Sequence, residues 1–193
     1  MDKNINIYMI GVGGQGIGLL SETLIRAADY ANLHVRGVDT HGLAQRGGTV
    51  QSHLRIGKGI YSSLIQKGKA DIVIALERTE ALRGMESYLK DNGTLIYYDT
   101  SWQALDVRLD KAKEVKNEDI FAESKKRDIE VVKVFKEDLE EARMQNVVIL
   151  GKIAKNKLIE EVSVENYKNA LADLLKGDVL AKNLEVFNEI LNL

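Results

Sequence analysis

The chain has 193 residues, of which 45% are hydrophobic and 29% are charged, a composition typical of a globular protein with one sizeable core. Its 27 Lys and Arg residues against 29 Asp and Glu residues leave a net charge of -2, so we expect neither nucleic acid nor an anionic membrane as a partner. No apolar run approaches the roughly 20 residues that span a bilayer, and the first residues lack the pattern of a signal peptide. We therefore expect a cytoplasmic protein.

Cysteine is absent from the chain. Iron-sulfur clusters are held by Cys thiolates, and structural zinc usually is too. The chain by itself is therefore expected to hold no iron-sulfur cluster, and any redox centre is expected on a partner. Proline is also absent, so no Pro-rich linker divides the chain. We predict a single domain over residues 1–193, with a C-terminal helical layer over about 137–193.

Strands and helices alternate from the N-terminus onward. The apolar run 5–10 predicts a buried strand, and helical spacing of apolar residues over 17–31 predicts an amphipathic helix. Residues 34–39 predict a second strand, which the right-handed crossover rule sets parallel to the first. Residues 49–56 alternate polar and apolar side chains, and a Gly-Lys-Gly turn joins them to the run 60–65. This pattern predicts a β-hairpin inserted after the second strand.

The alternation continues in the second half of the chain. The expected elements are a strand at 72–76, a helix at 79–90, an Asp-Asn-Gly turn, a strand at 94–98, a charged surface segment with helical turns at 102–128, a strand at 129–135, and helices at 137–155, 164–175 and from 179 onward. The pattern as a whole predicts an α/β fold in three layers, with a mostly parallel, Rossmann-like sheet, the hairpin insertion and C-terminal helices.

A glycine loop follows the first predicted strand. Gly11, Gly13 and Gly16 match G-x-G-x-x-G between a strand and a helix, where backbone N–H groups can approach a pyrophosphate. Asp39 ends the second strand, where a dinucleotide-binding fold has its ribose-binding carboxylate. One hypothesis is therefore a free-standing NAD(P) or FAD oxidoreductase. Another is that the glycines only allow the helix to pack closely on the strand.

Two departures favour a different phosphate-bearing ligand. Gly14 adds a fourth glycine and Gln15 a long amide to the loop. Asp39 is followed by a second loop, Thr-His-Gly-Leu-Ala-Gln-Arg-Gly-Gly, instead of a short connection to a helix. In this second loop Arg46 offers a fork-shaped guanidinium, which suits a phosphate or a contact with a partner subunit.

The two loops together carry a resemblance to a known family. "GVGGQGIGLL" and "HGLAQRGGTVQSHLRIG" resemble the gamma subunit or domain of the 2-oxoacid:ferredoxin oxidoreductases, and the Ala-Gln-Arg-Gly-Gly variant looks most like the small (beta) subunit of the indolepyruvate:ferredoxin oxidoreductases. "ADIVIALERTEALRG" and "DNGTLIYYDT" lie where that family has its next two strands. The resemblance is thin over 101–136 and only architectural in the C-terminal helices.

The resemblance implies a complex that oxidatively decarboxylates a 2-oxoacid, such as an arylpyruvate, transfers the acyl group to coenzyme A and passes electrons to ferredoxin. It also implies that thiamine diphosphate, Mg and the iron-sulfur clusters sit on a larger partner subunit. This chain would be a non-redox subunit, inactive alone, on the coenzyme A side of the active site. A third hypothesis is a non-catalytic assembly subunit whose loops touch only protein. No catalytic or metal-binding residue is assigned, and the candidate cofactor-binding residues are Gly11, Gly13, Gly14, Gln15, Gly16, Gln45, Arg46, Gly47 and Gly48.

Overall fold

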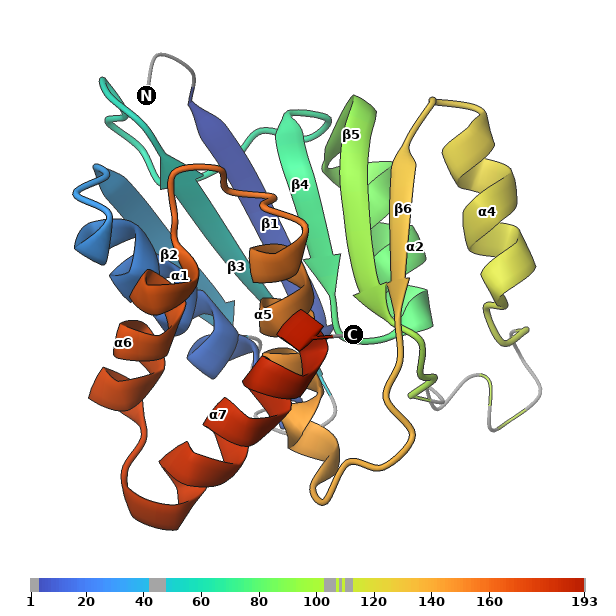
Figure 1. Cartoon of the computed structure of the whole chain (residues 1–193). Helices are drawn as coiled ribbons and strands as arrows, with labels where there is room; N and C mark the ends of the chain where they lie inside the picture. Colours follow the sequence, from blue (N-terminus) through green and yellow to red (C-terminus); the bar gives the residue numbers. More distant parts are fainter. Residues whose placement is uncertain (1–3, 42–47, 103–106, 108, 110–112, 193) are drawn as a thin grey trace.

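A six-stranded sheet with helices on both faces forms the centre of the computed structural model, which describes residues 4–41, 48–102, 107, 109 and 113–192 (Figure 1). The strands are β1 (Ile5–Val12), β2 (Val35–His41), β3 (Thr49–Ile56), β4 (Ala70–Ala75), β5 (Leu89–Tyr98) and β6 (Glu130–Val134). The helices are α1 (Ile17–Tyr30), α2 (Arg78–Ser87), α4 (Asn117–Lys125), the 3-10 turn η1 (Ala142–Met144), α5 (Gln145–Lys155), α6 (Val164–Leu174) and α7 (Gly177–Asn192).

The sheet has the strand order β2-β3-β1-β4-β5-β6. β1, β4, β5 and β6 pair in parallel, whereas β3 is antiparallel to both of its neighbours, β1 and β2. β2 therefore runs in the same direction as β1, as the crossover rule predicts, although β3 lies between them. The predicted three-layer α/β class with a mostly parallel sheet is confirmed.

The hairpin is made of different strands from those that the sequence pattern predicts. β3 pairs with β2, and residues 60–65 form no strand, so the predicted second arm is wrong. Side chains satisfy the backbone of this segment instead: the Arg36 Nε donates to the Ile60 carbonyl at 2.7 Å, and the Ile65 N–H donates to the His53 Nδ1 at 3.2 Å. Both edges of β3 are already occupied by β1 and β2, so no ladder position remains for a further strand.

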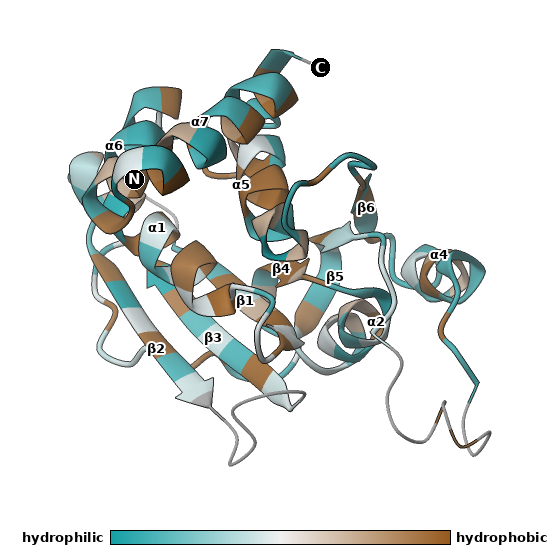
Figure 2. Ribbon diagram, turned by 90° about the horizontal axis from the view of Figure 1, so that it is seen from below, coloured by the Kyte–Doolittle hydropathy of each residue, from teal (hydrophilic) through white to brown (hydrophobic). Residues whose placement is uncertain are grey.

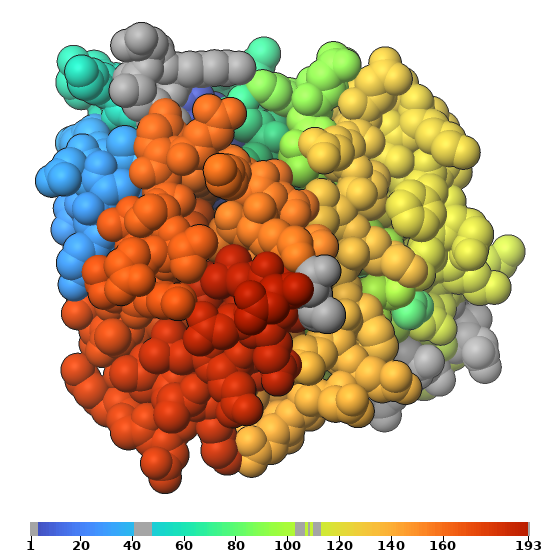
Figure 3. Space-filling view, viewed as in Figure 1, coloured from blue at the N-terminus to red at the C-terminus, as the bar shows by residue number. Residues whose placement is uncertain are grey.

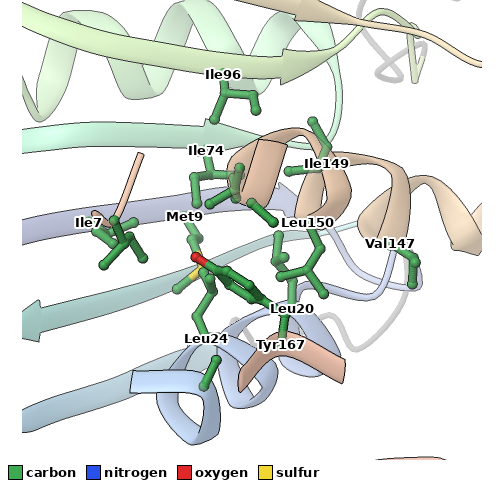
Figure 4. Close-up of a cluster of buried hydrophobic side chains, with 14 of the residues drawn as sticks. Ile7, Met9, Leu20, Leu24, Ile74, Ile96, Val147, Ile149, Leu150 and Tyr167 are labelled. Carbon is green, nitrogen blue, oxygen red and sulfur yellow. The ribbon is translucent and has the colours of Figure 1, made fainter. Parts of the chain in front are cut away.

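The core has one part on each face of the sheet. α1 and α5 lie against one face, with α6 packed on α1 and α7 packed on α5, and α2 and α4 cover the other face (Figure 2). In the space-filling view, the orange and red C-terminal helices lie in front of α1 and hide most of it (Figure 3). Figure 4 shows the larger cluster, in which sheet residues such as Met9 and Ile74 meet Leu24 of α1 and Leu150 of α5.

Several element boundaries differ from the predicted ones. The helix expected over 137–155 begins only at Gln145, because residues 137–141 are mostly exposed and charged and have no apolar stripe to bury. The predicted Asp-Asn-Gly turn lies within β5, where Asn92 has a φ of 56° and the register with β4 shifts. Ser163 caps α6, since its Oγ accepts from the Asn166 N–H at 3.2 Å.

Among the described residues, every helix is too short or too polar to cross a lipid bilayer.

Candidate functional site

The carboxyl ends of five strands point toward one edge of the sheet, the edge that Figure 2 views end-on. In α/β proteins ligands bind outside this edge, because the connections that leave the strands there can form a crevice. Both glycine-containing loops predicted from the sequence leave the sheet at this edge, one after β1 and one after β2.

The first glycine loop, residues 13–16, joins β1 to α1. Gly14 and Gly16 have φ values of 103° and 88°, a region that residues with a Cβ rarely adopt. Gln15 is only 6% exposed, and its side chain folds back over the loop. The side-chain Oε1 accepts from the Val12 N–H at 2.8 Å, and the backbone N–H of Gln15 donates to the Val12 carbonyl at 3.0 Å. The Oε1 of Gln15 therefore holds the loop in shape.

The second loop returns to the sheet beside the first. The Gly13 N–H donates to the Gly48 carbonyl at 2.8 Å, so the two loops are in direct contact. Gln45, Arg46 and Gly47 lie outside the described residues. Among the described residues, none has an atom within 4 Å of a Cβ built on Gly14 or Gly18. The Gly13 and Gln15 N–H groups already donate to backbone carbonyls, so an anion at this loop would be held by the N-terminal end of α1.

Asn146, in the first turn of α5, is a site residue that sequence reasoning missed. It is buried, and its Nδ2 donates to the Gly16 carbonyl at 3.1 Å. The signal in the sequence is the Gln-Asn pair that directly precedes the apolar centre of α5. A pocket of about 430 Å3 opens beside this contact, and it is lined by Gly16, Leu19, Glu141, Arg143, Met144, Asn146, Leu175, Asp178, Val179, Lys182 and Asn183.

Asp39 has a different role from the carboxylate of a dinucleotide-binding fold. Its Oδ1 accepts from the Ser21 hydroxyl at 3.0 Å and from the Ser52 hydroxyl at 2.6 Å. Because β3 separates β2 from β1, Asp39 lies two strand spacings, roughly 10 Å, from the strand that leads into the glycine loop. The separation of Asp39 from the glycine loop weakens the NAD(P) or FAD hypothesis.

A polar network centred on Asp99, directly after β5, connects three further elements at this edge of the sheet. The Asp99 carboxylate accepts from the Arg78 Nε at 2.6 Å, from the Asn117 Nδ2 at 3.0 Å and from the Lys133 Nζ at 3.2 Å. Burial by itself raises the pKa of this carboxyl, but the three hydrogen bonds outweigh burial and hold the pKa below its ordinary value. Asp99 thereby ties the start of α2, the start of α4 and β6 together.

We expect Asp99→Asn to lower the free energy of unfolding by about 1–2 kcal/mol at pH 7, since charge-assisted hydrogen bonds are lost. The folded-state pKa lies below the unfolded value of about 3.9, so the contribution is complete above that pH and is lost as the pH falls through the folded-state pKa. Urea unfolding at pH 7 and at pH 3 measures the difference. Asp91→Asn is the control, because Asp91 is 71% exposed in its pair with Arg127. An equal effect of Asp99→Asn at both pH values would contradict the assignment.

In the described part of the chain, no three His, Cys, Asp or Glu side chains lie close enough together to hold a metal ion. His53 is buried between Tyr8 and Tyr88, its Nδ1 accepts a backbone N–H, and burial lowers its pKa. His53 is therefore a neutral structural residue, as its place in a strand predicts.

The family model for "Pyruvate ferredoxin/flavodoxin oxidoreductase" matches residues 6–193. An indolepyruvate oxidoreductase subunit IorB from Archaeoglobus fulgidus is 34% identical over 185 residues, which cover 94% of this chain and 90% of that protein. The chain belongs to the pyruvate ferredoxin/flavodoxin oxidoreductase family, as the resemblance of its two loops predicts.

Solved structures share the fold at low sequence identity. The gamma subunit of a keto/oxoacid ferredoxin oxidoreductase from Geobacter sulfurreducens superposes with a TM-score of 0.69 at 20% identity, covering 97% of this chain and 96% of that subunit. A 2-oxoglutarate:ferredoxin oxidoreductase chain from Magnetococcus marinus, solved with 2-oxoglutarate, coenzyme A and succinyl-CoA bound, gives a TM-score of 0.68 at 20% identity. The match covers 98% of this chain and 31% of that longer chain, so the same fold also occurs as one part of a larger polypeptide.

Proposed function

We propose that this chain is the small, non-redox subunit of a 2-oxoacid:ferredoxin oxidoreductase that acts on an arylpyruvate such as indolepyruvate. In this proposal it forms the coenzyme A side of the active site, and a larger partner subunit carries thiamine diphosphate, Mg and the iron-sulfur clusters. The names of the relatives support the enzyme class. The division of labour is supported by the absence of Cys, because this chain has no thiolates with which to hold a cluster.

The contact between Gly13 and Gly48 carries the coenzyme A assignment. It places Gly48, which follows Arg46 by two residues in the sequence, against the glycine loop that leads into α1. Coenzyme A has a pyrophosphate and a 3′-phosphate, which suit these two kinds of donor: backbone N–H groups at the positive end of a helix and a guanidinium fork. The pocket beside Gly16 offers apolar walls within reach of the same loop. In this arrangement the subunit binds and orients coenzyme A, and the partner performs the redox chemistry.

Arg46→Ala in the reconstituted complex tests the proposal. We expect the KM for coenzyme A to rise roughly tenfold, while kcat at saturating coenzyme A and the KM for the 2-oxoacid stay within about twofold, because a binding contact is removed. Steady-state dye reduction with an arylpyruvate measures all three. Arg26→Ala is the matched control, since Arg26 pairs with Glu22 and Asp173 on the surface near the far end of α1.

Two other outcomes would support the rival hypotheses. Loss of complex assembly in Arg46→Ala, with an unchanged KM for coenzyme A in whatever complex forms, would identify a non-catalytic assembly subunit. Micromolar binding of NADH to the isolated chain, measured by calorimetry, would support a free-standing dinucleotide enzyme. The bonded state of Asp39 and its separation from β1 lead us to expect no NADH binding.

A further inference from the structure

Two buried carboxyl groups lie in the N-terminal turn of α2, at the same edge of the sheet. Glu77 is the N-cap, and its carboxylate accepts from the backbone N–H groups of Thr79, at 3.0 Å, and of Glu80. Capping a helix explains the burial of Glu77, since these N–H groups have no partner within the helix. Glu80 is just as deeply buried, at 4% exposed, but capping does not explain it.

The contacts of Glu80 lead to the second loop. Its Oε1 accepts from the Thr49 hydroxyl at 3.1 Å and from the Arg83 Nη1 at 2.5 Å. The same Arg83 nitrogen also donates to the Thr49 hydroxyl oxygen at 3.1 Å, so the three side chains close a triangle. The other oxygen of Glu80, Oε2, is buried without a hydrogen-bond partner among the described residues.

Burial of this carboxyl group costs free energy. Burial raises its pKa and outweighs the opposing charge of Arg83, and the nearby Glu77 raises the pKa further. A half-satisfied buried carboxyl group is unfavourable for folding, and such groups persist where they perform another task. Glu80 is too deeply buried for a substrate to reach it, so that task is not acid or base catalysis. Its described side-chain partners are Thr49 and Arg83.

Thr49 is the first residue of β3, where the chain re-enters the sheet after Gln45 and Arg46. This point is held from two sides. The Gly48 carbonyl accepts from Gly13 in the glycine loop, and the Thr49 side chain is held by Glu80 and Arg83 of α2. The paired main chains of β1 and β3 continue from there, beginning with Val12 opposite Thr49.

We infer that Glu80 is a positioning residue of the coenzyme A site: through Thr49, and with Arg83, it fixes the start of β3, where the Gly48 carbonyl contacts the glycine loop. This inference rests on the proposed function, because it assigns Glu80 a role in the coenzyme A site proposed there. Glu80 acts at a distance from the ligand, and its loss weakens binding by releasing the contact between the start of β3 and the glycine loop.

Four variants in the reconstituted complex test the inference. Thr49→Val and Glu80→Ala remove the hydroxyl-carboxyl contact, whereas Thr49→Ser and Glu80→Gln keep a hydroxyl and an acceptor oxygen at the same places. We expect the first two to raise the KM for coenzyme A roughly threefold to tenfold, the equivalent of one hydrogen bond, with kcat unchanged. The two conservative variants should stay close to wild type, because each keeps the hydrogen bond between the side chains at positions 49 and 80.

Hydrogen exchange in the isolated chain supplies a readout that needs no coenzyme A. Thr49→Val and Glu80→Ala should speed the exchange of the backbone amides at residues 48–51 roughly threefold to tenfold, and Thr49→Ser should restore slow exchange. Thr94→Val is the matched control. Thr94 is also half-buried in a strand, and its hydroxyl donates to the Glu130 carboxylate. This contact lies where β6 begins, away from the site. Thr49→Val keeps a β-branched residue, so it remains informative if Glu80→Ala fails to fold.

The outcomes separate this inference from the proposed function. Unchanged exchange in Thr49→Val would overturn the positioning role of Glu80. Faster exchange with an unchanged KM for coenzyme A would also overturn it, if Arg46→Ala in the same complex still raises that KM. If neither Arg46→Ala nor Thr49→Val changes that KM, the proposed function fails together with the inference.

Discussion

Gly16→Ala is expected to lower the free energy of unfolding by about 2–4 kcal/mol, which combines the strain of a left-handed residue with the loss of a buried hydrogen bond. Gly16 has a φ of 88°, where a Cβ is unfavourable. The Cβ would also lie 2.4 Å from the Asn146 Nδ2, the atom that donates to the Gly16 carbonyl. Asn146 is buried, so it can move away only by giving up that bond.

Two neighbouring glycines separate the causes of this effect. Gly14→Ala introduces strain without a clash, because no described residue lies within 4 Å of a Cβ there, and should cost about 1–2 kcal/mol. Gly18→Ala lies in the first turn of α1, where the geometry is helical and no described residue would contact the Cβ, and should stabilise the protein by about 0.5–1 kcal/mol.

Urea unfolding followed by circular dichroism measures the three free energies. The clash with Asn146 is isolated by a double-mutant cycle of Gly16→Ala with Asn146→Ala, in which we expect the two losses to be less than additive. Equal effects of Gly16→Ala and Gly18→Ala would show that the glycine loop does not pack against α5.

Tyr167→Phe is expected to raise the free energy of unfolding by about 1 kcal/mol, whereas Tyr167→Ala should lower it by about 3–5 kcal/mol. The ring fills the core between α6 and the sheet, where Figure 4 shows its hydroxyl beside Met9. The hydroxyl is buried without a hydrogen-bond partner among the described residues, and burial raises its pKa. Removing the hydroxyl therefore removes a desolvated polar group, and removing the ring leaves a cavity.

Tyr98→Phe is the matched control for the sign of the hydroxyl effect. The Tyr98 hydroxyl donates to the Lys136 carbonyl at 2.9 Å, so its removal should destabilise the protein by about 1 kcal/mol. Thermal and urea unfolding of the tyrosine variants give the comparison. Destabilisation by Tyr167→Phe as large as that by Tyr98→Phe would mean that the Tyr167 hydroxyl has a partner.

The elements with strong local patterns could be predicted from the sequence. The buried strands β1, β4 and β5 are short apolar runs, α1 has a clear apolar stripe, and α6 has a capping serine. The glycine loop could be predicted because glycines at this spacing, between a strand and a helix, are typical of a turn with positive φ values. The family could be predicted because two such loops occur together, and it is confirmed by the match over residues 6–193.

Pairing partners and buried polar contacts could not be predicted in the same way. The alternation in β3 indicates a strand but does not say which strands flank it, because the choice between β1, β2 and residues 60–65 depends on competition among distant segments. Glu80 looks like an ordinary polar position in the sequence, and the Gln-Asn pair that contains Asn146 does not show which residue Asn146 contacts. Their partners, Thr49 and Gly16, are far from them along the chain and close only in the folded structure.

The sequence by itself determined the α/β class, the two loops and the family, because each depends on local patterns of glycine, apolar and charged residues. The tertiary structure alone decided that β3 separates β1 from β2, which moves Asp39 away from the glycine loop and brings Gly48 to Gly13. The physical reason is that strand order and the pairing of buried polar groups are set by contacts between segments distant in sequence, which no local pattern contains.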